Sequence, residues 1–105
     1  MIARIWRGLA TAERADEYVR HLQQSVIPEL SRIEGFRGVY LLRRASADDV
    51  EFVVLTLWES MDAIRRFAGD SAEMAVVAEE AQAILSEYDA TVSHFEAVVS
   101  PERNH

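Results

Sequence analysis

Only a few side chains in this chain of 105 residues have the chemistry of an acid or a base near neutral pH. The sequence holds three histidines and no cysteine, which excludes thiolate catalysis, disulfides and cysteine-ligated metal or iron–sulfur sites. His94 lies in the middle of a strand-like stretch, SHFEA, and shares one side of it with Val92 and Glu96. On a face covered by helices, its imidazole would serve as a general base or hydrogen-bond a phenolic substrate. The alternative is a structural histidine at an edge or a dimer interface, held by a carbonyl group.

Arg4 and Trp6 share one face of the first strand-like stretch, IARIWRG, and Arg7 lies on the other face. This strand is expected in the centre of the sheet, so one of the two arginines should be buried and will need a partner. An ion pair with Glu51 or Glu96, the carboxylates available on other strands, is one outcome. The other is that Arg4 binds a carboxylate, enolate or phenolate group of a substrate.

Aromatic side chains supply the candidate binding surface for a planar substrate, because each ring buries a large apolar area as one rigid group. The candidates come from three strands and a helix: Trp6, Tyr40, Trp58 and Phe67. Ordinary core or interface packing is the alternative for each of them. His21, one helical turn after Tyr18, is expected at a solvent-facing boundary. Glu79 and Glu80 do not by themselves form a metal site, which needs several converging ligands, and no metal site is expected.

The elements that must position these side chains follow from the apolar periodicity of the sequence. Residues 2–8 are expected to form a strand, and Thr11 to cap a helix whose apolar residues recur at helical spacing, at Ala15, Val19, Leu22 and Val26. Pro28 should break or kink this helix near Ile27, because proline has no N–H to donate. The turn EGFRG then leads into a second strand, FRGVYLLRR.

The second half of the chain repeats this alternation. A short polar loop at 45–49 precedes a third strand at 51–58, EFVVLTLW. Ser60 is expected to cap a helix that Gly69 and Asp70 interrupt. A further helix is expected to carry an apolar stripe at Val77, Ala81, Ile84 and Tyr88. The closing strand is expected at 91–99.

This order predicts an α+β, ferredoxin-like βαββαβ fold, in which a four-stranded antiparallel sheet carries helices on one face. A single domain is expected over residues 1–100, with a flexible tail at 101–105. Both sides of the strand at 51–58 are largely apolar, although the chain offers helices for only one face of the sheet. We therefore expect a second copy to cover the free face, which makes the protein a homodimer. An equivalent sheet of a different protein is the alternative.

The charge of the chain narrows its possible partners. Eighteen acidic and eleven basic residues give a formal net charge of −7, which argues against non-specific binding to nucleic acid or to an anionic membrane. The first residues, MIARIWRGLA, do not form a signal peptide, and no apolar run approaches the roughly 20 residues needed to span a bilayer. We expect a cytoplasmic protein.

Four segments, in this order, make the chain resemble the antibiotic biosynthesis monooxygenase family within the dimeric α/β-barrel superfamily. They are IARIW, EGFRGVYLL, LTLWES and SHFEAV, and the resemblance covers about residues 1–99. It implies a homodimer in which two sheets form a barrel, with a ligand pocket between sheet and helices in each subunit. Several family members oxidise aromatic polyketide intermediates with molecular oxygen and without a metal or flavin. The resemblance therefore implies that no cofactor is needed.

One branch of this family degrades haem and is similar to the chain in its W-E-S junction. That branch needs an asparagine in the first strand, a tryptophan in the second helix and a histidine ligand about ten residues later. The corresponding positions here are Trp6, Phe67 and about Val77. Valine cannot ligate iron, so haem degradation is disfavoured. Branches that act on quinones or signalling molecules often carry a histidine pair in the region 69–82, which contains no histidine here.

Two functions follow from the residues and the resemblance together. The first is a cofactor-independent monooxygenase for a small planar aromatic or quinone-like substrate, with His94 as the catalytic base. Its binding residues would be Arg4, Trp6, Tyr40, Trp58 and Phe67. The second is a non-catalytic dimeric module of the same fold that binds a small ligand or is associated with stress. A cavity lined by aromatic rings around one polar group would favour the enzyme.

Overall fold

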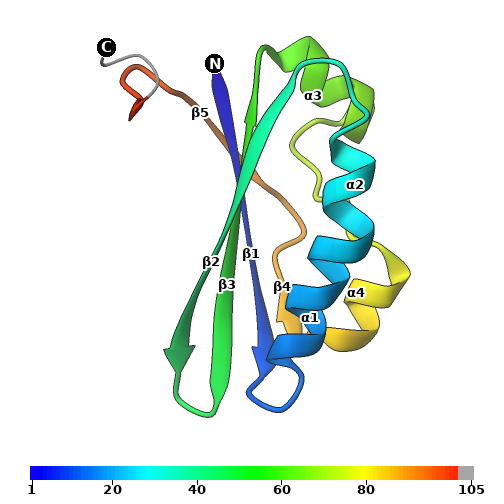
Figure 1. The fold of residues 1–105 in the computed structure, drawn as a ribbon, viewed down its shortest axis with the longest axis vertical. Coiled ribbons are helices and arrows are strands. Elements are labelled where there is room, and N and C mark those ends of the chain that lie inside the picture. The colour runs from blue at the N-terminus through cyan, green and yellow to red at the C-terminus, as the bar shows by residue number, and fades with distance from the viewer. Residues whose placement is uncertain (102–105) are drawn as a thin grey trace.

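One antiparallel sheet carries the helices of residues 15–84 on a single face (Figure 1). The computed structural model describes residues 1–101, so residues 102–105 of the expected tail lie outside the described residues. The long strands are β1 (Ile2–Thr11), β2 (Phe36–Ser46) and β3 (Asp49–Trp58), in the order β2-β3-β1. The free edge of β1 pairs with two short strands, β4 (Glu87–Tyr88) and β5 (Ser93–Glu96). The predicted α+β, ferredoxin-like fold is confirmed, with its fourth strand divided in two.

The register of the sheet decides which side chains face the helices. Arg4 on β1 lies between Thr56 on β3 and His94 on β5, so these three side chains share one face. Phe52 and Trp58, which have the same parity as Thr56, are fully buried under the helical layer. The predicted division of the third strand into two faces is therefore confirmed, and His94 lies on the helix-covered face.

The first helical run passes along the sheet in three pieces: α1 (Ala15–His21), the π-helix η1 (Leu22–Val26) and α2 (Ile27–Leu30). The N–H of Ile27 bonds to the carbonyl of Leu22, five residues back, which is the π pattern. Pro28 follows in the first turn of α2, where its missing N–H costs least. The break predicted near Ile27 is thus a local widening of a continuous helix. Among residues 1–101, no helix is long and apolar enough to cross a membrane.

Thr11 does not cap the first helix. It is the last residue of β1, where it pairs with Asp49, and α1 begins only at Ala15, without a side-chain cap. The pairing of β1 with β3 extends the strand beyond the predicted end at residue 8 and so includes Thr11. The cap predicted at Ser60 is confirmed, because its Oγ accepts a hydrogen bond from the N–H of Ala63, at 3.2 Å, and begins α3 (Met61–Ala68).

The last third of the chain is less regular than predicted. After Gly69 an irregular segment leads to α4 (Glu79–Ile84), which ends where Leu85 adopts an extended conformation. Tyr88 lies in β4 and not on the apolar stripe of a helix, because the backbone from Ser86 onward bonds to β1. The closing strand, predicted at 91–99, is regular only over Ser93–Glu96.

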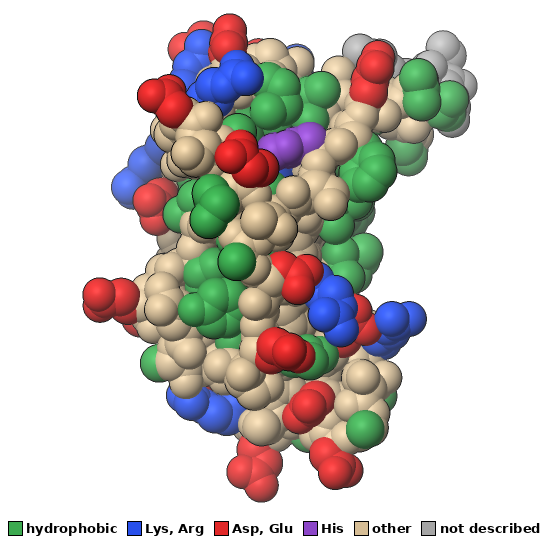
Figure 2. Space-filling model, turned by 180° about the vertical axis from the view of Figure 1, so that it is seen from behind, with side chains coloured by type: hydrophobic (Ala, Val, Ile, Leu, Met, Phe, Trp, Pro, Cys, Tyr) green, Lys and Arg blue, Asp and Glu red, His purple; other side chains and the backbone are tan. Residues whose placement is uncertain are grey.

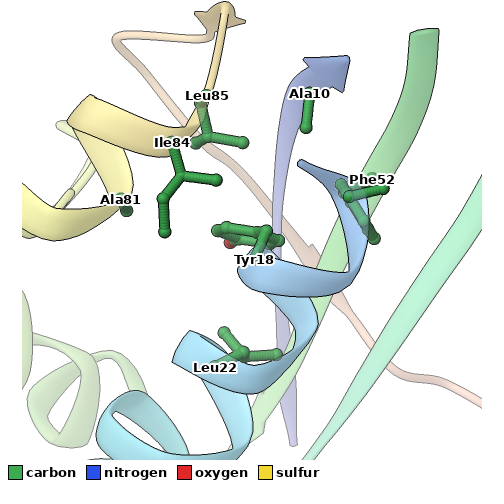
Figure 3. Packing of buried hydrophobic residues seen from close by; sticks show 8 residues of the cluster. Ala10, Tyr18, Leu22, Phe52, Ala81, Ile84 and Leu85 are labelled. Carbon is green, nitrogen blue, oxygen red and sulfur yellow. The ribbon is translucent and has the colours of Figure 1, made fainter. Parts of the chain in front are cut away.

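Two apolar clusters hold the helices on the sheet. In the first, Tyr18 of α1 lies between Phe52 of the sheet and the side chains of Ile84, at the end of α4, and Leu85, the residue after it (Figure 3). The ring centroids of Tyr18 and Phe52 are 4.9 Å apart. The second cluster packs α2 and α3 onto the end of β3, around Trp58 and Ile64.

Within residues 1–101, no helix covers the opposite face of the sheet. Large apolar side chains remain exposed on it, among them Tyr40, Leu42 and Phe95, at 57%, 49% and 56% exposure. Figure 2, which views the molecule from behind, shows hydrophobic side chains along the sheet side, on the right. The face also carries Glu51, whose carboxylate pairs with Arg44 and Arg7 of neighbouring strands. These two arginines lower the pKa of the Glu51 carboxyl below its usual range.

Candidate functional site

A cavity lies between the sheet and the helical layer, with walls from both apolar clusters. Its floor consists of β1 and β3 side chains: Arg4, Trp6, Val54 and Thr56. The first helical run covers it with Tyr18, His21, Leu22 and Val26, and Phe67 and Val77 close its sides. The cavity encloses about 570 Å³, counting its open mouth. Its lining is mostly apolar with a few polar groups, as in small-molecule sites.

Arg4 is the charged group of this cavity. The residue is only 4% exposed, and its guanidinium donates hydrogen bonds to the carbonyl oxygens of Ala72 and, at 2.9 Å, Met74. A third N–H lies 3.0 Å from Nε2 of His94, so two of the five guanidinium N–H groups have no partner among the described residues. Burial lowers the pKa of Arg4, but a guanidinium stays protonated at neutral pH.

The ion pair expected for the buried arginine is not the one that forms. Arg4 is held by carbonyl groups and an imidazole, while Glu51 pairs with Arg7 on the opposite face of the sheet. The reason is parity, because Glu51 and Arg4 point to opposite sides of the sheet. Two N–H groups of a cation therefore remain for a ligand oxygen in the cavity.

His94 stands beside the cavity and contacts it through Arg4. A guanidinium only donates, so Nε2 of His94 accepts the hydrogen bond and the ring proton resides on Nδ1. Burial, and then the charge of Arg4, lower the pKa of His94, while Glu73 acts in the opposite direction. The neutral, accepting form of the ring is thereby favoured. The cavity walls do not include His94.

Trp6 and Phe67, two of the predicted binding residues, line the cavity. The indole Nε1 of Trp6 donates to the carbonyl of Asp89 at 2.8 Å, and its ring lies between Tyr18 and Tyr88, with centroids 6.5 and 6.3 Å away. The ring of Phe67 faces the Arg4 guanidinium, whose central carbon lies 5.8 Å from the ring centroid. Both rings are therefore fixed in orientation, which suits the binding of a planar molecule.

Trp58 and Tyr40 do not reach the cavity. Trp58 is fully buried behind Phe67, with which its ring stacks at 5.8 Å, and its Nε1 donates to Thr56 Oγ1 at 2.8 Å. It therefore belongs to the core that supports Phe67. Tyr40 pairs with Leu55 and lies on the helix-free face of the sheet, so the structure separates it from the other candidates.

His21 was expected at a solvent-facing boundary, and this expectation is wrong. The residue is 8% exposed and lines the cavity. The buried stripe of α1 is centred on Tyr18, which is 3% exposed, and not on Val19. The spacing from Ala15 to Tyr18 and Leu22 is also helical, and it places His21 beside this stripe.

Burial raises the pKa of the Tyr18 hydroxyl far above its ordinary value. Tyr18 therefore stays protonated and does not act as a base.

The positions that the haem-degrading branch uses for catalysis are here parts of the cavity wall. Trp6, Phe67 and Val77 line the cavity, and none of them offers a ligand to iron. Within residues 1–101, no group of three or more His, Asp or Glu side chains gathers in a way that would hold a metal ion.

Comparisons with known proteins identify the family of the chain and structures that have the same fold. Residues 1–72 match the family model described as antibiotic biosynthesis monooxygenase. No curated protein sequence matches the chain.

Several solved structures have the same fold, among them the following three. A putative antibiotic biosynthesis monooxygenase from Bacillus cereus is 17% identical, with 95% of this chain and 94% of that chain covered and a TM-score of 0.67. A variant of SnoaB, a cofactor-independent oxygenase from Streptomyces nogalater, is 18% identical, with 95% of both chains covered and a TM-score of 0.64. The haem-degrader MhuD from Mycobacterium tuberculosis, with two haems in its active site, is 20% identical, with 95% and 98% covered and a TM-score of 0.60. At these identities the likeness shows the fold, and the activities are those of the named proteins.

Proposed function

Because the chain belongs to the antibiotic biosynthesis monooxygenase family, we propose that its cavity binds a small planar aromatic or quinone-like molecule and oxidises it with molecular oxygen, without a bound cofactor. The observation that carries the proposal is the combination of fixed aromatic walls with one buried cation. Trp6 and Phe67 would hold the ring, and Arg4 would stabilise an oxygen anion of the substrate.

The reaction requires the protein to deprotonate the substrate and to stabilise the resulting anion. A hydroxylated ring loses its O–H proton to a base, and the resulting anion reduces oxygen and binds it at a ring carbon as a peroxide anion. The base returns the proton to this anion, which becomes a hydroperoxide. Loss of water then leaves a quinone, so one oxygen atom enters the product and the other leaves as water. The substrate supplies all the electrons. A dry cavity favours this sequence, because desolvation strengthens the interaction between the anion and Arg4.

His94 remains our candidate for the catalytic base from the sequence. Its lone pair is occupied by Arg4 in this arrangement, so His94 would act only after substrate binding displaced that contact. Hydrogen bonds in an empty site often rearrange in the substrate complex. Substrate contacts of Trp58 and Tyr40 are not part of the proposal.

The proposal includes the homodimer and the cytoplasmic location expected from the sequence. Support for the dimer comes from the apolar side chains exposed on the helix-free face, which a second copy of the same sheet would cover.

Oxygen uptake with a dihydroxynaphthalene tests the function. Protein treated with a chelator should consume oxygen in step with the appearance of a quinone absorption band. Replacing Arg4 by Met should lower turnover about 10²-fold, the usual effect of losing one group that stabilises an anion. Arg65→Met, at an exposed arginine of α3 paired with Asp62, is the matched control and should leave turnover unchanged.

Two results would contradict the proposal. Oxygen uptake that is equally insensitive to Arg4→Met and Arg65→Met would place the reaction outside the cavity. Binding of the naphthalene without any oxygen uptake would favour the alternative, a non-catalytic module that binds small ligands.

A further inference from the structure

One nitrogen of the His21 imidazole has a hydrogen-bond partner, and the other nitrogen has none among residues 1–101. Its Nδ1 lies 3.2 Å from Oε2 of Glu80, which reaches it from α4. Its Nε2 is buried and has no hydrogen-bond partner among residues 1–101. A buried polar atom without a partner is unfavourable, so its persistence in a folded protein asks for an explanation.

The contact with Glu80 determines what the free nitrogen offers. An ionised carboxylate only accepts hydrogen bonds, so the ring proton of a neutral His21 resides on Nδ1. Nε2 then carries a bare lone pair. The same arrangement, with a carboxylate that orients an imidazole through Nδ1, makes Nε2 a base in hydrolytic triads and stabilises the imidazolium after it accepts a proton.

His21 lies in the wall between an outer groove and the cavity. The charged groups on the outer side line the groove: Glu80 from α4, Glu17 and Arg20 from α1, and Arg14 from the residue before α1. The Glu80 side chain is 76% exposed, whereas that of His21 is only 5% exposed. On the cavity side, His21 shares the wall with the apolar side chains of Leu22, Val77 and Ala81 and with Tyr18, whose ring centroid lies 6.2 Å from that of His21. An unpaired lone pair in such surroundings favours a ligand that brings its own donor.

We propose that His21, oriented by Glu80, accepts the substrate proton in place of His94, and that the substrate carries a hydroxyl group for His21 and a second oxygen for Arg4. The proposal rests on the function proposed above and specifies its substrate class as a planar ring with two oxygen substituents. The substrate O–H bond breaks, its electron pair stays on oxygen, and the proton forms an N–H bond at Nε2. Arg4 on the sheet stabilises the anion, and Glu80 on the helical side stabilises the imidazolium. His21 differs from His94 in that its accepting nitrogen is not occupied by an arginine.

The test uses para-nitrophenol, whose absorption reports whether the bound molecule is ionised, and its methyl ether, para-nitroanisole, which has no proton to give. We expect the intact protein to bind the phenol in preference to the ether and to raise the phenolate fraction of the bound probe above that in free solution at the same pH. His21→Gln keeps a polar group in place but cannot accept the proton. This variant should lose the added phenolate band and reduce the preference for the phenol roughly tenfold, about the size of one hydrogen bond to a charged group.

Three controls separate the contributions. Glu80→Gln keeps the hydrogen bond to Nδ1 without the charge and should reduce the phenolate band by a smaller factor than His21→Gln. Arg65→Met, at an exposed arginine of α3 outside the cavity wall, should leave the band unchanged. Binding of para-nitroanisole by all three variants with unchanged affinity would show that the cavity remains folded.

The outcomes distinguish this inference from the function on which it rests. A phenolate band that persists in His21→Gln would show that Arg4 alone ionises the probe, which overturns the role of His21 and leaves the proposed function intact. A band that disappears in His94→Gln and persists in His21→Gln would assign the proton to His94 instead. Failure of the intact protein to bind either probe would overturn both proposals, because the cavity would not be a site for planar aromatic molecules.

Discussion

The contact between Arg4 and His94 makes the stability of the fold depend on the protonation of one imidazole. Burial and the neighbouring cation lower the pKa of His94, so the folded protein binds this proton more weakly than the unfolded chain. The contribution of neutral His94 to stability is therefore complete above the ordinary histidine pKa of 6.5 and is lost as the pH falls below it. Protonation would also place two cations in contact, 3.0 Å apart.

We expect the intact protein to lose more stability than His94→Gln when the pH is lowered from about 7.5 to about 5, a window that spans the usual titration of histidine. Glutamine retains an acceptor for Arg4 and does not titrate. Urea denaturation midpoints at the two pH values measure the difference. The other histidines are present in both proteins, so their effects cancel. A parallel decline of the two midpoints would show that the His94–Arg4 contact does not oppose protonation.

Single residues could be predicted from the sequence where a regular period places them. The alternation along β1 and the helical period of α3 bring Arg4, Trp6 and Phe67 to one cavity. Tyr40 was misplaced because its sheet face depends on a β-bulge between Phe36 and Gly38, which a local pattern does not show. His21 was missed because its burial depends on α4, almost sixty residues away in the chain.

At the scale of elements, Tyr18 attaches the first helix to both the sheet and α4. Its ring is 3% exposed and lies between Phe52 and the side chains of Ile84 and Leu85. Replacing Tyr18 by Ala should destabilise the protein by about 3–5 kcal/mol, the usual cost of removing a large buried aromatic side chain. Tyr18→Phe keeps the ring and should cost less than about 1 kcal/mol. Chemical denaturation measures both, and equal effects would contradict a role that depends on the ring.

The helical run after β1 and the helix α3 were predicted where the structure has them, whereas the last helix was predicted too long. The period of Val77, Ala81 and Ile84 continues to Tyr88 in the sequence, and this predicted a longer helix. In the structure, the N–H groups of Ser86 and Asp89 instead bond to the carbonyls of Leu9 and Arg7. The edge of β1 lies near the other end of the chain, and no local sequence pattern indicates that residues 86–89 pair with it.

At the scale of the whole molecule, the helix-free face of the sheet predicts self-association. Light scattering at micromolar concentration should give about twice the monomer mass of 11.9 kDa. The dimer is expected to bury an interface of roughly 1,600 Å². Leu42→Glu, on this face, should produce a monomer, because it would bury two unpaired charges in a symmetric interface. Gln24→Glu, on the exposed side of η1, adds the same charge and should leave the dimer intact. A native monomer would refute the barrel.

Arg4 also holds together the two sides of the cavity. The same guanidinium that is offered to a substrate oxygen donates to the carbonyls of Ala72 and Met74, in the irregular segment between α3 and α4 that continues into the cavity wall. A ligand that draws the guanidinium toward itself would therefore weaken the hydrogen bonds that hold this segment. Ligand affinity and the stability of the cavity wall would then depend on one side chain. Natural variation at this position would change both together, so a family member with a more stable wall and the same affinity must have altered another residue.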